Sequence, residues 1–176
     1  MPVLENLGPR ICILGPSNSG KSTLADAIEH KLTIPAVHLD QLYHQPHTNW
    51  VPRPEADFVA LHQAAIAQEQ WVMEGNYTRH LPARLERATG FILLDVSTAT
   101  SLLRYFRRTL FERDRRGALE GGKDSVKWQM IRHITVVTPP NRQKYLKIFA
   151  ASTLPKVRLG SPRELQQFYQ AEGLER

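Results

Sequence analysis

The sequence predicts a single three-layer α/β domain in which helices cover both faces of a parallel sheet. Three observations carry this prediction. The 176 residues correspond to about one domain, since domains typically hold about 100–200 residues. Short apolar runs alternate with segments of helical periodicity, as expected of right-handed βαβ crossovers. A glycine-rich turn joins the first apolar run to the first helical segment.

The elements of the amino-terminal half follow from apolar runs and helical periodicity. They are expected, in chain order, as a strand at Arg10–Leu14, a helix from Lys21 to about Leu32, a strand at Pro35–Leu39 ending at Asp40, a loop at Gln45–Pro54, a helix at Glu55–Gln68 and a strand at Trp71–Met73 ending at Glu74. The first strand is apolar almost throughout, which is typical of a strand buried on both faces.

The carboxyl-terminal half repeats the alternation. Its elements are expected as a strand at Phe91–Leu94 ending at Asp95, a helix at Ser97–Phe111, helices at Ser125–Val137 and Asn141–Ala151 separated by Pro139 and Pro140, a strand at Lys156–Leu159 and a last helix that begins with a capping box at Ser161. The charged segment Glu112–Lys123 contains Gly117, Gly121 and Gly122. These glycines break any helix there and predict a mobile lid loop over about residues 112–123.

The composition excludes several classes of protein. The chain is 41% hydrophobic and 23% charged, which is the ordinary globular range. Its apolar runs fall far short of the roughly 20 residues that a membrane helix needs, and no secretory signal begins the sequence. The single cysteine, Cys12, cannot form an internal disulfide. We therefore expect a cytoplasmic protein with no membrane partner.

The positive charge is concentrated in one third of the chain. The formal net charge is +6, and the segment from Arg104 to Lys147 contains twelve basic and four acidic residues. Arginine outnumbers lysine sixteen to seven, which suits bidentate recognition of phosphate. Small polyanions and nucleic acid both fit this pattern, so the charge alone does not choose between them.

The segment from Gly15 to Ser22 matches the phosphate-binding pattern G-x-x-x-x-G-K-[ST] and lies between an apolar strand and a helix. In such a loop, backbone N–H groups and the helix N-terminus bind phosphate. Lys21 is expected to reach the β- and γ-phosphates, and the Ser22 hydroxyl to bind Mg²⁺. The expected ATP-binding residues are Gly15, Pro16, Ser17, Asn18, Ser19, Gly20, Lys21, Ser22 and Thr23.

Two carboxylates are candidates for the acidic residue that binds Mg²⁺ at this site. Glu74 and Asp95 each end a strand that could neighbour the phosphate-binding strand. Asp95 follows the better apolar run, and its alternative role is that of a capping or loop carboxylate. Glu74 is followed by Gly75, whose missing side chain would let a ligand approach the backbone. We therefore expect Glu74 to serve Mg²⁺ together with Ser22.

Asp40 is the candidate acceptor-side acid. It follows the second strand, at the same edge of the sheet as the phosphate-binding loop. A carboxylate there could bind an acceptor hydroxyl and take its proton during phosphoryl transfer. A solvated turn residue is the alternative. His38, two residues earlier, is expected to be a packed or hydrogen-bonded core residue and not a base.

Arginines follow the fourth strand at helical spacing. Arg104 and Arg108 are four residues apart and therefore share a helix face. The run continues into the glycine-containing loop, which could close over a transferring phosphoryl group. Exposed arginines often only solvate a helix. The nearly uniform sign of the run favours a role at phosphate.

Taken together, these segments resemble the adenylate-kinase-like P-loop kinases, and more closely the bacterial DNA topology modulation (FlaR-like) proteins. The likeness rests on ICILGPSNSGKSTLADAI, HLDQLY, WVMEGNYTRHLPARL and ILLDVSTATSLLRYFRRT, and spans roughly residues 10–170. The elements D-x-L-Y, W-V-x-x-G-N-Y and R-x-x-x-R narrow it beyond the superfamily. It implies a P-loop NTPase fold whose five parallel strands lie in the order 2-3-1-4-5.

The resemblance also implies roles for individual residues. Its third strand usually ends in Asp-Gly, where the acid organises Mg²⁺ and the glycine lies beside the acceptor; Glu74 and Gly75 hold these places. Arg79 corresponds to an arginine near the acceptor. Arg104 and Arg108 match arginines at the lid entrance, Arg108 near the transferring phosphate. The usual acceptor pattern Thr-Gly-Asp-x-x-Arg is replaced by HLDQLY, so AMP is not the expected acceptor.

Two functions are open at this point. The first is an ATP- and Mg²⁺-dependent phosphotransferase acting on a small molecule, in which Lys21, Asp40, Arg104 and Arg108 are catalytic and Gly75 and Arg79 face the acceptor. The second is a nucleotide-dependent nucleic-acid-binding protein with weak ATPase activity. Against the second, no helix-turn-helix, RNP signature or other base-reading motif is present.

Overall fold

A computed structural model describes residues 3–48, 50–111, 128 and 132–175. For residues 108–111, 133, 134 and 138 it describes the backbone alone. The expected lid, about residues 112–123, therefore lies outside the described residues.

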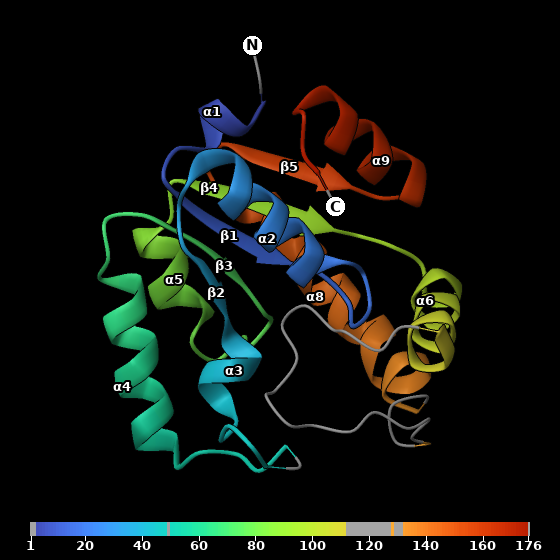
Figure 1. Cartoon of the computed structure of the whole chain (residues 1–176), viewed down its shortest axis with the longest axis horizontal. Coiled ribbons are helices and arrows are strands. Elements are labelled where there is room, and N and C mark those ends of the chain that lie inside the picture. The colour runs from blue at the N-terminus through green and yellow to red at the C-terminus, as the bar shows by residue number, and fades with distance from the viewer. Residues whose placement is uncertain (1–2, 49, 112–127, 129–131, 176) are drawn as a thin grey trace.

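The sheet has five parallel strands in the order β2-β3-β1-β4-β5, which confirms the predicted fold class and strand order (Figure 1). The strands are β1 (Arg10–Leu14), β2 (Ala36–His38), β3 (Trp71–Glu74), β4 (Gly90–Leu94) and β5 (Lys156–Leu159). In the register of β2 and β3, His38 lies beside Glu74. In that of β1 and β3, Ile13 lies on the other side of Glu74. β3 is therefore an inner strand, flanked by β2 and β1, and its carboxyl end lies at the edge where such sheets bind ligands.

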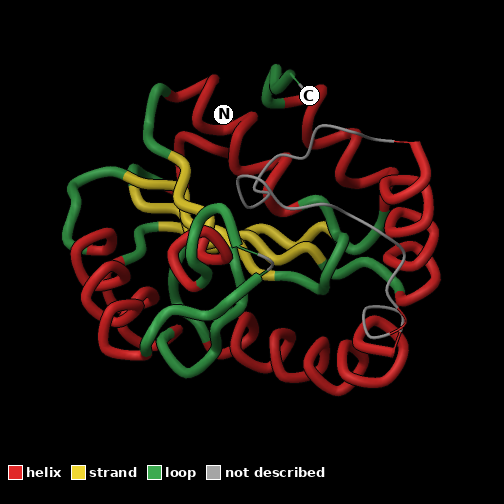
Figure 2. The backbone as a smooth tube through the Cα atoms, turned by 60° about the horizontal axis from the view of Figure 1, so that its bottom comes forward, coloured by secondary structure: helices red, strands yellow, loops and turns green. Residues whose placement is uncertain are grey.

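Helices cover both faces of the sheet, so the domain has three layers (Figure 2). One core cluster contains apolar side chains from α1 (Val3–Leu7), α2 (Lys21–Leu32) and α9 (Pro162–Ala171). The other contains side chains from α3 (Leu39–Tyr43), α4 (Glu55–Ile66), α5 (Leu81–Arg87) and α8 (Thr138–Ala151). Successive strand residues alternate between the two: Ile11 and Ile13 belong to the first, Cys12 and Leu14 to the second.

Three short helices, α1, α3 and α5, were not predicted, because their five to seven residues are too few to show a helical period. The α3 helix changes the predicted second strand. That strand ends at His38 and not at Leu39, and Asp40 lies in the first turn of α3. A carboxylate there is favoured by the partial positive charge of a helix N-terminus.

The predicted break at Pro139 and Pro140 is wrong. Both prolines lie in the first turn of α8, which directly follows a π-helix at His133–Val137. Proline is tolerated in a first turn because its missing N–H would have no intrahelical acceptor there. The remaining helix, α6, spans Thr98–Phe111. Among the described helices, none combines the length and apolarity needed to cross a membrane.

Candidate functional site

The loop between β1 and α2 begins and ends with glycines that its geometry requires. A Cβ on Gly15 would lie 2.5 Å from the Leu94 carbonyl oxygen. Gly20 is the N-cap of α2 and has a φ of 99°, in a region that other residues adopt rarely. The Lys21 Nζ donates to the Pro16 carbonyl at 2.9 Å. The lysine therefore folds back over the loop, towards the space that phosphates occupy in loops of this kind.

Two polar side-chain atoms of the loop are buried. Among the described side chains, Asn18 Oδ1 and Ser19 Oγ are buried and have no hydrogen-bond partner. The Ser19 hydroxyl can donate to a phosphate oxygen, but the Asn18 amide oxygen only accepts, so phosphate cannot satisfy it. The fit of this loop to a phosphate chain therefore rests on the backbone N–H groups at the start of α2.

Glu74 lies at the carboxyl end of β3 and is 4% exposed. Its Oε1 accepts from the Ser22 hydroxyl at 2.9 Å and from His38 Nδ1 at 3.0 Å. Burial acts to raise the pKa of Glu74, but the hydrogen bond from His38 and the nearby charge of Lys21 outweigh it and lower the pKa. The structure thus holds an ionised carboxylate against the first turn of α2.

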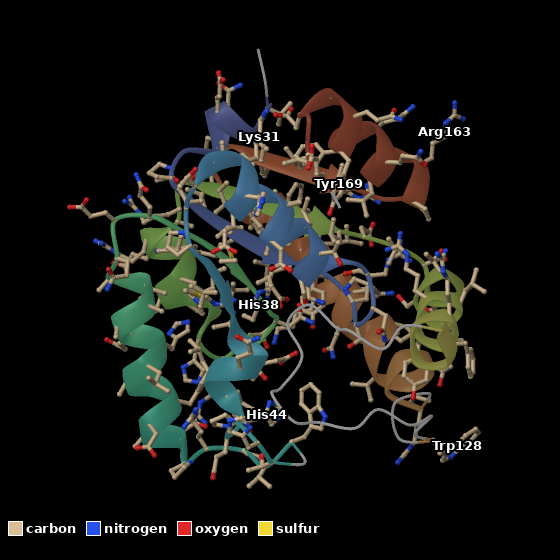
Figure 3. All side chains as sticks on the ribbon, in the orientation of Figure 1. Lys31, His38, His44, Trp128, Arg163 and Tyr169 are labelled. Atoms are coloured by element: carbon tan, nitrogen blue, oxygen red, sulfur yellow. The ribbon has the colours of Figure 1, made fainter. Side chains whose placement is uncertain are left out.

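His38 connects Glu74 to α2. Its Nε2 lies 2.9 Å from Asp26 Oδ1, and its side chain is 10% exposed. It is found at the lower end of β2, beside α2 (Figure 3). Burial acts to lower the pKa of His38, but hydrogen bonds and charge from Glu74 and Asp26 outweigh it and raise the pKa. The expectation of a hydrogen-bonded core histidine fits these contacts.

Asp95, the other candidate magnesium ligand, forms ion pairs with two arginines. Its buried carboxylate pairs with Arg142 through Oδ1 and with Arg158 through Oδ2, the latter at 2.6 Å. Burial acts to raise the pKa of Asp95, but the two arginines outweigh it and lower the pKa. Of the two candidates, Glu74 is therefore the one that contacts the P-loop serine.

The donor set at Ser22 and Glu74 fits Mg²⁺. Both offer oxygen atoms, only 2.9 Å apart, and Mg²⁺ prefers oxygen ligands. Within the described part of the chain, no three His, Cys, Asp or Glu side chains form a metal cluster. Two protein ligands suffice for Mg²⁺ at phosphate sites, since it keeps several waters and binds substrate oxygens as well.

Asp40 meets the segment that follows β3. Its Oδ1 accepts from the Tyr77 hydroxyl at 2.6 Å. Burial and the Asp40 charge raise the pKa of Tyr77, so the phenol stays a proton donor. Gly75 has a φ of 128°, and a Cβ there would lie 2.8 Å from Leu39 Cβ. The glycine thus lets α3, which carries Asp40, pack closely against the end of β3.

The arginines predicted from sequence fall into different environments. Arg104 of α6 donates through Nη1 to the Ser19 carbonyl and so touches the P-loop. Arg79 is 81% exposed and pairs with Glu55 of α4 at 3.2 Å. The Arg108 side chain lies outside the described part of the structure. Of the arginines predicted from the sequence, Arg104 is thus the one that contacts the P-loop among the described residues.

A buried arginine that the sequence did not reveal organises the segment after β3. Arg84 of α5 is fully buried and donates to the carbonyl oxygens of Gly75 at 2.7 Å and of Asn76 at 2.5 Å. Asn76 Oδ1 in turn accepts from the Gly15 N–H at 3.3 Å. Burial lowers the pKa of Arg84. Through these contacts the helix α5 holds the segment after β3 against the P-loop.

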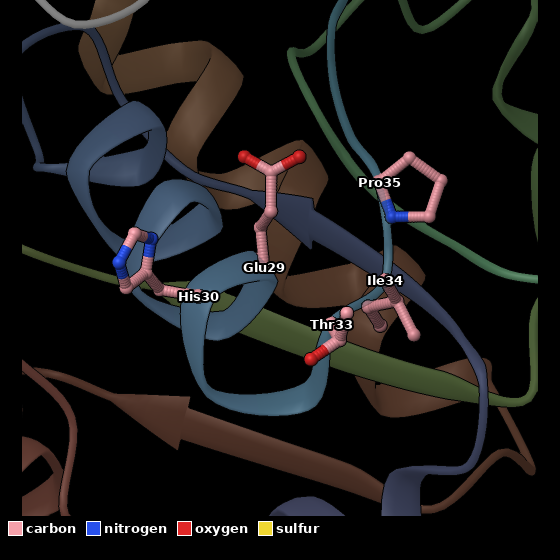
Figure 4. A pocket seen from close by; sticks show the side chains of 5 residues that line it. All are labelled: Glu29, His30, Thr33, Ile34 and Pro35. Atoms are coloured by element: carbon pink, nitrogen blue, oxygen red, sulfur yellow. The ribbon is translucent and has the colours of Figure 1, made fainter.

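A surface cavity of about 490 Å³ lies away from this site. It is lined by Glu29, His30, Thr33, Ile34 and Pro35, around the end of α2 and the turn into β2 (Figure 4). Lys21 and Ser22 lie at the opposite end of α2. The cavity therefore contains none of the residues discussed above.

No family model and no curated protein matches the sequence. Solved structures do resemble the fold. A shikimate kinase from Acinetobacter baumannii aligns with a TM-score of 0.55 at 14% identity, covering 96% of this chain and 94% of that one. A deoxyadenosine kinase from M. mycoides gives 0.52 at 14% identity, with 93% and 96% covered. A gluconokinase from Sinorhizobium meliloti 1021 gives 0.50 at 17% identity, with 96% and 91% covered. The chain therefore has the fold of P-loop kinases, and the likeness to FlaR-like proteins stays a prediction.

Proposed function

We propose that this protein is an ATP- and Mg²⁺-dependent phosphotransferase that acts on a hydroxyl group of a small molecule. The observation that carries the proposal is the contact between Ser22 and Glu74 beside the P-loop. A serine hydroxyl and an ionised carboxylate in this position suit a nucleotide-bound Mg²⁺. The likeness in fold to kinases of shikimate, deoxyadenosine and gluconate supports the same class of reaction.

The nucleotide half of the proposed site is built from the P-loop. The P-loop, residues 15–23, holds the phosphates through its backbone N–H groups, except at Pro16, which has none, and Lys21 neutralises charge on the β- and γ-phosphates. Ser22 and Glu74 would hold Mg²⁺, which supplies further neutralisation of the phosphate oxygens. Arg104, already in contact with the Ser19 carbonyl, and Arg108 add positive charge where the transferring phosphoryl group bears its negative charge.

The acceptor half centres on Asp40. The acceptor oxygen forms a bond to the γ-phosphorus while the bond from that phosphorus to the bridging oxygen breaks, so ADP leaves. Asp40 takes the proton of the acceptor hydroxyl. Tyr77, which donates to Asp40 Oδ1 at 2.6 Å, orients the carboxylate. Gly75 and Arg79 are proposed to face the acceptor as well. The nucleic-acid alternative stays a prediction, because none of these contacts concerns a nucleic acid.

The proposal is tested by transfer of labelled phosphate from ATP to a panel of alcohols. The panel should include gluconate, shikimate, deoxynucleosides and simple hydroxy acids, each with Mg²⁺ present. We expect one class to accept label with the wild type, and Asp40→Asn to lose this transfer while retaining ATP binding. Nucleotide binding without transfer to any alcohol, combined with salt-sensitive binding of DNA, would favour the nucleic-acid function instead.

A further inference from the structure

His38 occupies a position that the proposed chemistry does not yet use. It ends β2, and its ring lies between two carboxylates, with Nδ1 at 3.0 Å from Glu74 and Nε2 at 2.9 Å from Asp26. Asp26 belongs to α2, and Glu74 to β3. One imidazole therefore ties the P-loop helix to both strands on the acceptor side of the sheet.

The bridge leads directly to the oxygen that contacts Ser22. Glu74 Oε1 accepts from both His38 and the Ser22 hydroxyl. Ser22 and Asp26 are four residues apart on α2 and so share one helix face. A closed ring of contacts results, from Ser22 through Glu74 and His38 to Asp26 and back along the helix. In such a ring the Glu74 carboxylate cannot turn about its side-chain bonds without losing a hydrogen bond.

The imidazole of His38 uses a different nitrogen for each carboxylate. Nδ1 lies 3.0 Å from Glu74 Oε1, and Nε2 lies 2.9 Å from Asp26 Oδ1. The two contacts together fix the position of Glu74 relative to α2.

We propose that His38 is a positioning residue of the magnesium-nucleotide site: by contacting Asp26 and Glu74 together, it fixes the Glu74 carboxylate beside the Ser22 hydroxyl. This inference rests on the proposed function. A residue that only stabilised the fold would affect ATP binding equally with and without Mg²⁺. A positioning role for His38 instead makes the effect of Mg²⁺ on ATP binding depend on this histidine. Partners of this kind behind metal ligands commonly contribute about 10–100-fold to metal affinity.

The test is calorimetric titration with ATP, once with Mg²⁺ and once with EDTA, on the wild type, His38→Asn and Asp26→Asn. The dissociation constant in EDTA divided by that with Mg²⁺ measures how much Mg²⁺ strengthens ATP binding. We expect His38→Asn to lower this ratio by about tenfold and to leave ATP affinity in EDTA within about twofold. Asp26→Asn should act in the same direction but more weakly, because His38 keeps its bond to Glu74.

His62→Asn is the matched control. His62 is also a buried histidine, 2% exposed, but it lies on α4. The His62→Asn variant should have a lower melting temperature than the wild type and the same ratio of dissociation constants. Equal losses of ATP affinity with Mg²⁺ and with EDTA in His38→Asn would overturn the proposal, as would a wild type that binds ATP equally well under both conditions.

A second measurement does not need nucleotide. In ¹⁵N spectra of the histidine rings, assigned by the signals lost in His38→Asn, Asp26→Asn should shift the Nε2 signal of His38 more than its Nδ1 signal. Identical His38 signals in the wild type and in Asp26→Asn would overturn the bridge. A wild type that binds no ATP while its His38 signals respond to Asp26→Asn in this way would refute the proposed function and leave the bridge standing.

Discussion

Acidification should destabilise this fold through His62. The histidine lies on the buried stripe of α4 with Phe58 and Ile66, and its Nε2 has no hydrogen-bond partner among the residues that the structure describes. Burial, together with the charges of Arg84 and His80, lowers the pKa of His62 from 6.5 to about 4. The folded protein therefore keeps this ring neutral under conditions in which the unfolded chain protonates it.

The sign and size of the effect follow from this difference. Between its unfolded pKa of 6.5 and its folded pKa of about 4, His62 binds a proton in the unfolded state only, so stability is lost as the pH falls through this window. A difference of one pKa unit is worth about 1.4 kcal/mol, which gives a full effect of about 3 kcal/mol. From about pH 7.5 to pH 5 the loss amounts to about 2 kcal/mol.

The assay is urea unfolding of the wild type and of His62→Asn at both pH values. All other titrating groups contribute to both proteins, so the difference between their pH dependences isolates His62. The free energy of unfolding of His62→Asn should fall by about 2 kcal/mol less than that of the wild type on acidification. Parallel pH dependences would refute the inference that the folded protein keeps this ring uncharged.

Three further substitutions probe the site and its support. Asp40→Asn should lower the rate of phosphoryl transfer by about 10²–10⁴-fold and leave the ATP dissociation constant within about twofold, as compared by steady-state kinetics and calorimetry. Arg84→Met should cost about 3 kcal/mol or more in urea unfolding, because the carbonyl oxygens after β3 lose charged donors, and it should weaken ATP binding through the link from Asn76 to Gly15. Asp95→Asn should cost about 1.5–3 kcal/mol by removing the charged acceptor of two partly exposed arginines, while ATP still binds; unchanged stability would contradict the importance of these ion pairs.

The sheet could be predicted from the sequence because most of its strands contain short apolar runs. Ile11–Leu14 and Phe91–Leu94 show this most clearly, and both runs are buried on each face of the sheet. The α3 helix could not be predicted, because HLDQLY is too short to distinguish a strand end from one helical turn. Proline at the start of α8 was misread as a break, since a sequence does not show whether proline precedes a helix or occupies its first turn.

The residues of the P-loop are apparent from their spacing, but the contacts that support them are not. Arg84 has no signal in the sequence, because an arginine in a short helix is normally exposed. Its role depends on three carbonyl oxygens that the turn after Gly75 brings together. The partners of His38 depend on strand register and on the placement of α2. Asp95, by contrast, ended a strand as predicted, and only the fold could show that Arg142 and Arg158 meet it there.

Binding of ATP to Lys21→Ala, compared with the wild type and with Lys31→Ala, tests the central proposal most directly. Lys31 lies in the last turn of the same helix that Lys21 begins. The two variants therefore each remove one positive charge, at opposite ends of α2. Calorimetry with Mg²⁺ should show ATP binding to the wild type and Lys31→Ala with the same affinity, and a loss of at least about tenfold in Lys21→Ala, since Lys21 carries charge to the phosphates. Equal ATP affinity in all three proteins, or no ATP binding by the wild type, would contradict it.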